Sequence, residues 1–147
     1  GHGVTLILKK PGSGLIYMEA IIPIFGKSRS RIKEALGKIG NIAMARIDYC
    51  QLSSRYDAFM RGEHVNIFDM SLAAGTLMDL GIYCVYATVD LFGKPKNIKA
   101  TASYLYNSAD GSGSAIFEYD TFPSVLTARL YSLSILGVPL SICLKII

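Results

Sequence analysis

The pattern of apolar and polar positions predicts a strand, a helix and a second strand in the first third of the chain. Apolar residues run almost continuously over residues 14–25 until a proline interrupts them, which is typical of a short buried strand. Apolar side chains then recur three to four positions apart over residues 28–41, which predicts a helix capped by Ser28 or Ser30. Residues 41–52 alternate but carry apolar side chains on both faces, so we expect a strand with most of its surface covered.

The middle of the chain combines an irregular segment with a long apolar helix. Residues 53–71 mix polar and aromatic side chains with no regular period, and long irregular loops of compact domains are often functional. A helix is expected over residues 73–92, with Ser71 as a possible cap. It ends at Gly93, where glycine permits a left-handed stop, and Pro95 prevents continuation.

The rest of the chain reads as strands joined by tight turns. Residues 96–107 and 115–121 alternate on either side of a Gly-rich hairpin turn at 108–114, and residues 124–135 form a third strand. Consecutive hairpins give an antiparallel sheet, and the two predicted helices are the candidates to cover one of its faces. The predicted fold class is therefore α+β, an open and mostly antiparallel β-sheet with helices packed on one face.

Length and composition indicate one domain. The chain has 147 residues, 51% of them hydrophobic, which suffices for one domain with a real core but not for two ordinary ones. Gly1 and His2 resemble a tag remnant, which leaves residues 3–147 as the domain. No signal peptide precedes the fold, and the apolar tract from Leu133 is interrupted by glycine, proline and lysine, so we expect no membrane span.

Charge and cysteine usage narrow the classes of partner. The formal net charge of +4 is densest over residues 27–38, where the absence of interleaved aromatics favours a solvated helix face over a nucleic-acid site. The three cysteines lack metal-ligand spacing, and one internal histidine accompanies them, which argues against a metal site and for a reducing, cytoplasmic compartment. Motifs of phosphate loops, zinc proteases and serine hydrolases are absent.

Asp79 and Tyr83 are the candidate chemistry of the apolar helix. They lie four residues apart, so at 3.6 residues per turn the carboxyl and the phenol project from one face. They are either two satisfied polar groups of a packed helix or half of a reaction site. The periodicity by itself favours the first interpretation, because paired polar groups are structural as often as catalytic.

Three stretches match, in order and spacing, the motifs of one family of oxidoreductases. Residues 73–100 follow the pattern G-G-[AG]-L-x-D-x-G-x-[HY] and then F-G-x-P before a strand, although Ala73 and Ala74 replace its first glycines. Residues 15–21 contain its M-E-A strand, and residues 32–42 resemble the helix and turn that follow. The chain thus resembles the Gfo/Idh/MocA family over roughly residues 15–120. Tyrosine in the last motif position is similar to the dimeric dihydrodiol dehydrogenase branch.

The resemblance implies hydride transfer between NAD or NADP and a hydroxyl or carbonyl carbon of a sugar, polyol or diol. In that reaction Tyr83 is the general acid/base and Asp79 orients the substrate hydroxyl. A phenol with an ordinary pKa near ~10 needs a nearby cation for this task, and the family supplies it as a lysine of an E-K-P motif in another domain. Further substrate contacts are expected from the irregular segment, at Arg61, His64 and Asn66.

The resemblance also implies that the cofactor is held elsewhere. Family members carry an N-terminal Rossmann domain, and this chain resembles only the C-terminal, substrate-binding domain, with the Rossmann domain absent. Glu19 is expected near the nicotinamide edge in the intact enzyme, while the fragment alone is expected to bind no cofactor and to be inactive. No family motif accounts for residues 134–147.

A homodimer through the sheet is the expected assembly. Aromatic side chains on successive strands form either a dimer contact or part of the core under the helices, and they are Tyr104, Tyr106, Phe117 and Tyr119. A different class of function stays open: a cofactor-free binding or dimerisation module that uses the same sheet. It would tolerate loss of the Asp79 and Tyr83 functional groups.

Overall fold

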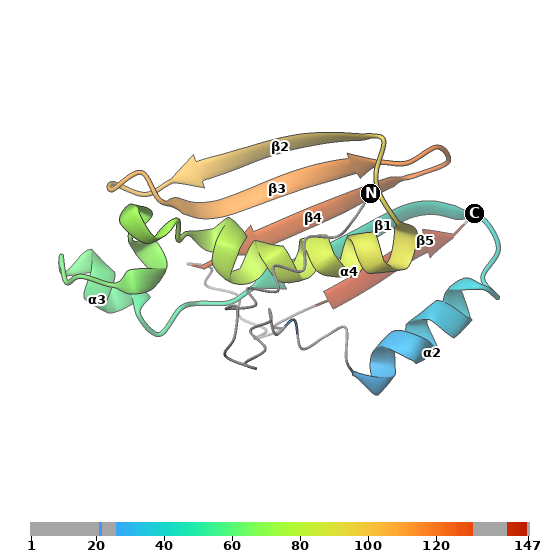
Figure 1. The fold of residues 1–147 in the computed structure, drawn as a ribbon, viewed down its shortest axis with the longest axis horizontal. Coiled ribbons are helices and arrows are strands. Elements are labelled where there is room, and N and C mark those ends of the chain that lie inside the picture. The colour runs from blue at the N-terminus through green and yellow to red at the C-terminus, as the bar shows by residue number, and fades with distance from the viewer. Residues whose placement is uncertain (1–20, 22–25, 131–140, 147) are drawn as a thin grey trace, which may run out of the picture.

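The protein forms a five-stranded sheet with helices along one face (Figure 1). The structure, a computed structural model, describes residue 21, residues 26–130 and the backbone of residues 141–146. Glu19 and nearly all of the strand predicted at 14–25 lie outside the described residues. The predicted fold class is confirmed, because the sheet is open and three of its four strand pairings are antiparallel.

Strand order places the predicted hairpins at one side of the sheet and β1 near the other, in the order β2-β3-β4-β1-β5. The strands are β1 (Ile42–Cys50), β2 (Asn97–Tyr104), β3 (Asp110–Glu118), β4 (Pro123–Arg129) and β5 (Ser141–Ile146). The antiparallel run from β2 to β4 is the predicted one. β1 pairs with β4 in parallel, which requires the long crossover that the intervening helices provide. β5, which no sequence motif indicated, pairs antiparallel with β1.

The first hairpin turn lies earlier than its glycines suggest. It spans residues 105–109, where Ser108 has a φ of 69° and the Asn107 side-chain oxygen accepts a backbone N–H. Gly111 and Gly113 belong to β3 instead. The prediction of a turn over 108–114 was therefore displaced, because an asparagine side chain that bonds the backbone closes a turn as well as glycine does.

The first described helix, α2 (Lys27–Leu36), is held by charge and not by burial. None of its residues is buried, and neither predicted serine caps it: the cap position is Gly26, without a side-chain bond. Arg29 and Lys33 instead contact the Asp90 carboxylate at 2.7 and 2.9 Å. Asp90 belongs to the central helix of the fold, α4 (Ile82–Phe92). Part of the basic surface expected to be solvated thus ties α2 to its neighbour.

Residues 53–71 are more ordered than their sequence pattern indicates. They form α3 (Tyr56–Met60) and two 3₁₀ turns, η1 (Asn66–Phe68) and η2 (Met70–Leu72). Phe59 and Phe68 are buried here, with ring centroids 4.5 Å apart, in a cluster that reaches Leu130 at the end of β4. Short elements hide the period that would reveal a longer helix, so the segment reads as irregular although it has its own core.

The central helix begins with a wide turn and ends where predicted. A π-helical turn, η3 (Leu77–Gly81), leads into α4 (Ile82–Phe92), and Gly93 ends it with a φ of 80°. Ser71 does not cap it, because it lies in η2. The Asp110 carboxylate of β3 accepts the Leu77 N–H at 2.6 Å. The helix start is therefore fixed from the sheet.

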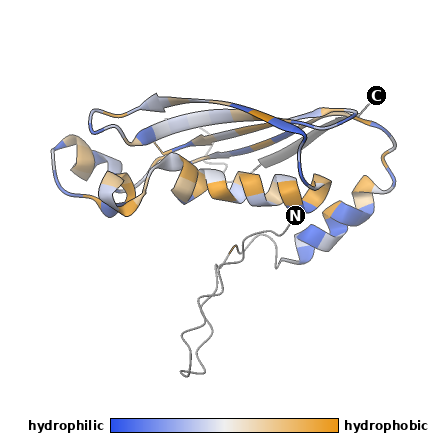
Figure 2. Ribbon diagram, turned by 45° about the horizontal axis from the view of Figure 1, so that its top comes forward, coloured by the Kyte–Doolittle hydropathy of each residue, from blue (hydrophilic) through white to orange (hydrophobic). Residues whose placement is uncertain are grey.

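Apolar side chains cover most of α4, whereas α2 is largely hydrophilic (Figure 2). Within the described chain one helical stretch, Met70–Phe92, is long and apolar enough to cross a membrane by length and composition. The same stretch covers the sheet, with Cys84 and Thr88 almost fully buried. Since 39% of the apolar window is buried, packing on the sheet accounts for only part of its apolar character.

The aromatic side chains of the hairpins serve the helix side of the sheet. Phe117 is buried beneath the helix, and Tyr106 stacks on Phe59 with ring centroids 4.5 Å apart. Tyr104 borders a hollow beside the helix, and the Tyr119 hydroxyl donates to a backbone carbonyl just past α4. Phe117 thus packs in the core, whereas Tyr104 and Tyr106 are 71% and 68% exposed, so for these two the dimer contact stays a prediction. The opposite face carries small polar side chains in register, namely Thr101, Ser114, Thr127 and Asp48.

Candidate functional site

Asp79 and Tyr83 meet around one side chain of the sheet. Tyr83 contacts Tyr49 of β1, with ring centroids 5.6 Å apart and planes at 62°. Asp79 also acts electrostatically on Tyr49. All three side chains are half-buried. The carboxyl and the phenol that the sequence singled out therefore lie at one place, between the central helix and β1.

The turn that carries Asp79 is wider than an α-helical turn. Asp79 lies in η3, where hydrogen bonds span five residues, and Tyr83 lies in the regular helix beyond it. Spacing of 3.6 residues per turn therefore does not describe the step between them. Such π turns occur often at functional sites, and nothing in the sequence pattern announces this one.

The site consists of acidic side chains that lie partly inside the protein. Burial raises the pKa of Asp79. The pKa of Tyr49 is also raised, most by burial and then by Tyr83 and by Asp79. Within the described residues, no hydrogen bond or ion pair engages the Asp79 carboxylate or the Tyr83 hydroxyl. A half-buried carboxylate without a partner favours an incoming hydrogen-bond donor or cation.

The predicted substrate contacts lie in the segment before the helix, where two of them pair with acidic side chains of the same segment. His64 Nε2 lies 2.7 Å from Asp69 Oδ2, and Arg61 pairs with Glu63 at 2.7 Å. Asn66 is exposed at the start of η1. The structure joins none of the three predicted residues to Asp79 or Tyr83 by a hydrogen bond or ion pair. His64 instead borders a separate hollow of about 390 Å³.

Asp69 is the anchor of that segment and was not singled out by the sequence. Its carboxylate accepts from the Ser71 hydroxyl at 2.7 Å and the Ser71 N–H at 2.8 Å. Ser71 first, and then His64, lower the pKa of Asp69 to about 2. Ser71 thus matters for the loop and not for the helix that it was expected to cap.

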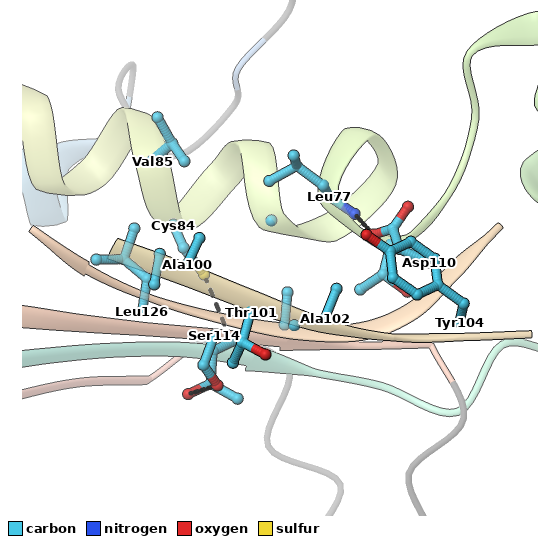
Figure 3. A pocket seen from close by; sticks show the side chains of 16 residues that line it. Leu77, Cys84, Val85, Ala100, Thr101, Ala102, Tyr104, Asp110, Ser114 and Leu126 are labelled. Atoms are coloured by element: carbon cyan, nitrogen blue, oxygen red, sulfur yellow. Dashed lines mark hydrogen bonds between the residues drawn. The ribbon is translucent and has the colours of Figure 1, made fainter. Parts of the chain in front are cut away.

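A second hollow, of about 350 Å³, lies between the central helix and strands β2 to β4 (Figure 3). Leu77, Cys84 and Val85 border it from the helix, and the small side chains of Ala100 and Ala102 leave it open. Neither Asp79 nor Tyr83 lines it. Burial raises the pKa of the Cys84 thiol to about 12, so this thiol is protonated and unreactive.

The described residues offer little to a metal or to a dinucleotide. They contain no group of three or more His, Cys, Asp or Glu side chains arranged to hold a metal ion. Glu19, the predicted neighbour of the nicotinamide, lies outside them. The Asp79–Tyr83 site can orient a bound hydroxyl and exchange a proton with it. An ionised Asp79 carboxylate would repel the phosphates of a cofactor.

Comparison with known proteins gives the same picture. The family model described as GFO/IDH/MocA C-terminal domain matches residues 30–132. The chain is 42% identical over 121 residues to scyllo-inositol 2-dehydrogenase (NADP(+)) IolU of Bacillus subtilis, and 30% identical over 118 residues to trans-1,2-dihydrobenzene-1,2-diol dehydrogenase of Mus musculus. These matches cover 82% and 78% of this chain but 37% and 33% of those proteins. The chain thus spans about a third of its relatives' length.

Solved structures share the fold at low sequence identity. Levoglucosan dehydrogenase in complex with NADH has a TM-score of 0.74 at 15% identity, over 88% of this chain and 38% of that one. The WlbA dehydrogenase from Bordetella pertussis, in complex with NADH and UDP-GlcNAcA, has a TM-score of 0.66 at 15% identity, over 84% and 38%. At these identities the likeness establishes the fold alone, and the family rests on the sequence matches. By those matches, this chain belongs to the Gfo/Idh/MocA family of oxidoreductases, as its C-terminal domain.

Proposed function

We propose that this chain is the substrate-side domain of an NAD- or NADP-dependent oxidoreductase that acts on a hydroxyl or carbonyl group of a sugar, polyol or diol. The proposal is supported by relatives named for scyllo-inositol and for a dihydrobenzene diol. The observation that carries it is the convergence of a carboxyl and a phenol around Tyr49, both half-buried and both without a hydrogen-bond partner in the described part of the chain.

Tyr83 is the group that moves the proton. Its phenolate oxygen accepts the proton of a substrate hydroxyl during oxidation, and the resulting phenol returns a proton to the carbonyl oxygen during reduction. NAD or NADP, when bound, supplies the acceptor or donor of the hydride. Because a phenol ordinarily holds its proton up to a pH near ~10, Tyr83 needs a cation beside it, which we assign to a lysine outside the described residues.

Asp79 orients the substrate. Its carboxylate accepts a hydrogen bond from a substrate hydroxyl, which satisfies an oxygen that has no partner within the described protein. The same carboxylate stabilises the incoming lysine ammonium. Arg61, His64 and Asn66 remain proposed contacts for the outer part of the substrate, and Glu19 for the nicotinamide edge. They require movement or a second domain to approach the site.

The proposed assembly is a cytoplasmic homodimer through the open face of the sheet, without nucleic-acid or membrane partners. The support is the row of small polar side chains on that face, where the Ser114 hydroxyl lies 3.4 Å from that of Thr127. One carboxylate oxygen of Asp48 in the same row is buried without a hydrogen-bond partner among the described residues. A second sheet laid on this row would bury flat polar surface and supply donors.

Activity of the full-length protein that carries this chain tests the proposal. Oxidation of scyllo-inositol and of a cyclic trans-diol is followed by NADH or NADPH absorbance, with each cofactor in turn. We expect Tyr83→Phe to lower kcat/KM by about 10²–10⁴-fold, the usual contribution of general acid/base catalysis. Asp79→Asn is expected to lower it by at least about tenfold.

The control is Tyr119→Phe, which removes a phenol hydroxyl bonded to the Gly93 carbonyl, far from the proposed chemistry. Its activity should equal that of the wild type. Full activity in both Asp79→Asn and Tyr83→Phe would favour the cofactor-free binding or dimerisation module instead. The 147-residue chain alone is expected to be inactive with either cofactor.

A further inference from the structure

Tyr49 is the side chain that joins Asp79 to Tyr83, and no motif of the sequence points to it. It lies in β1 at the same parity as Ala45 and Ile47, which are both fully buried. Tyr49 therefore faces the central helix, because alternate residues of a strand share a face. It packs against both apolar clusters of the protein. Its position is thus set by the strand and the core.

The contact with Tyr83 has the geometry that aromatic pairs prefer. The ring centroids are 5.6 Å apart and the planes are inclined by 62°, an edge-on arrangement. Within the described residues this is the ring contact that Tyr83 makes. Since the Tyr83 hydroxyl has no hydrogen bond there, the Tyr49 ring is the group available to fix the direction of the Tyr83 phenol.

We propose that Tyr49 is the positioning residue of Tyr83: its ring holds the Tyr83 phenol beside Asp79, and its own hydroxyl stays protonated while Tyr83 exchanges a proton with the substrate. The catalytic part of this inference rests on the function proposed above. The ring contact between Tyr49 and Tyr83 and the grouping of Tyr49, Tyr83 and Asp79 are independent of that function.

The charges around Tyr49 agree with a phenol that keeps its proton. Burial raises its pKa most, and the charges of Tyr83, Asp79 and Cys84, in that order, raise it further. All three of these groups come from the central helix. On the sheet, the register neighbour of Tyr49 in β4 is Ala128, which carries no charge. No cation of the described residues lowers the pKa of Tyr49, so it remains a neutral phenol near pH 7.

Titration of the tyrosines in the 147-residue chain tests the grouping. The ring carbons of ¹³C-labelled tyrosine report each phenol separately in NMR spectra. We expect Asp79→Asn and Tyr83→Phe each to lower the pKa of Tyr49, because each removes a neighbouring negative charge. Tyr119 is the internal control, since burial alone raises its pKa. An unchanged Tyr49 titration in both variants would overturn the proposal.

Two substitutions of Tyr49 in the full-length protein test its positioning role. Tyr49→Phe keeps the ring, so kcat is expected within about twofold of the wild type. Tyr49→Leu removes the ring, and kcat is expected to fall about two- to tenfold with little change in KM, the range that corresponds to one aromatic contact. In the same variant the Tyr83 ring signals should shift. They should stay in place in Tyr49→Phe.

The outcomes separate this inference from the proposed function. If Tyr83→Phe abolishes activity while Tyr49→Leu changes neither kcat nor the Tyr83 signals, the positioning role is wrong and the function stands. If the wild-type protein shows no oxidoreductase activity, the function and the catalytic part of the inference both fail, whereas the titration still decides the grouping. If Tyr49→Leu does not fold, Tyr49→Phe and the titration remain decisive: a large loss of kcat in Tyr49→Phe contradicts a role of the ring alone.

Discussion

The two flanks of the central helix differ in what they offer to a ligand. On the β1 flank, Asp79 and Tyr83 gather with Tyr49 into a group of acids, and among the described residues no hydrogen bond or ion pair engages the Asp79 carboxylate or the Tyr83 hydroxyl. On the β2 flank, the helix borders a hollow of about 350 Å³ whose one ionisable helix side chain, Cys84, holds its proton. This hollow thus borders a thiol that holds its proton, and neither Asp79 nor Tyr83 lines it.

This difference teaches that the volume of a hollow and the presence of ionisable groups are separate criteria for an active site. Pockets with apolar walls and a few convergent polar groups are the usual candidates for active sites. Here the chain spans about a third of the length of its relatives, and neither Asp79 nor Tyr83 lines the hollow of about 350 Å³. An unfinished site is recognised by unpaired polar groups and not by enclosed volume.

Gly75→Ala is expected to have the largest effect on stability, because both flanks depend on where the helix starts. Gly75 has a φ of 132°, and an added Cβ would lie 1.9 Å from Asp110 Oδ1. Strain and the displaced carboxylate together should lower the free energy of unfolding by about 2–4 kcal/mol. Denaturant unfolding of the 147-residue chain measures it.

Gly40→Ala is the matched control for that substitution. Gly40 also has a positive φ, of 76°, but nothing lies within 4 Å of an added Cβ. Only backbone strain should remain, about 1 kcal/mol. Equal losses in the two glycine variants would show that the contact with Asp110 contributes nothing.

Filling the hollow on the β2 flank is expected to have an effect of intermediate size on the free energy of unfolding. Ala102→Leu places apolar atoms between β2 and the helix, where we expect a gain of about 0.5–1 kcal/mol in the free energy of unfolding. Catalytic activity of the full-length protein should not change. If the hollow were a substrate pocket, activity would instead fall steeply, because the leucine would occupy the space of the substrate.

Thr101→Leu is the control for Ala102→Leu. Its side chain points to the opposite face of β2, as Figure 3 shows for Thr101 and Ala102. The leucine therefore adds the same apolar surface without a hollow to fill. A gain in Thr101→Leu equal to that in Ala102→Leu would assign the effect to strand propensity.

Asp79→Asn is expected to have the smallest effect on stability, although it lowers activity. Burial raises the pKa of Asp79 above its unfolded value near ~3.8, so folding favours the protonated form. Stability is therefore lost as pH rises from the unfolded pKa through the folded one, and it stays lower above that. Asparagine removes this loss, so at neutral pH the variant should gain less than about 1 kcal/mol, because solvent still screens a half-buried carboxylate.

The pH dependence of unfolding checks this prediction. The difference in stability between wild type and Asp79→Asn should vanish below pH ~3 and appear as the pH rises through the folded pKa of Asp79. The same variant should lose activity in the full-length protein. A variant that loses stability at neutral pH would indicate that the carboxylate has a partner in the intact protein.

The local pattern of the sequence predicted those elements that carry a regular period or a clear end signal. The strand from Ile42 to Cys50 and the helix end at Gly93 were predicted because alternation and a glycine with positive φ are local signals. The caps at Ser28 and Ser71 were wrong. A cap depends on which backbone N–H a side chain reaches, and Asp110 from a strand 33 residues away reaches Leu77 first.

The sequence by itself determined the fold class and the family, since motif spacing and alternation are written along the chain, and it singled out Asp79 and Tyr83 as a pair whose role stays a prediction. Tertiary structure alone decided that Tyr49 joins that pair, because a strand and a helix 30 residues apart meet only through the core. It also decided that His64 turns to Asp69, where a hydrogen bond of 2.7 Å is available within the loop. Contacts between distant residues depend on packing, which no local pattern encodes.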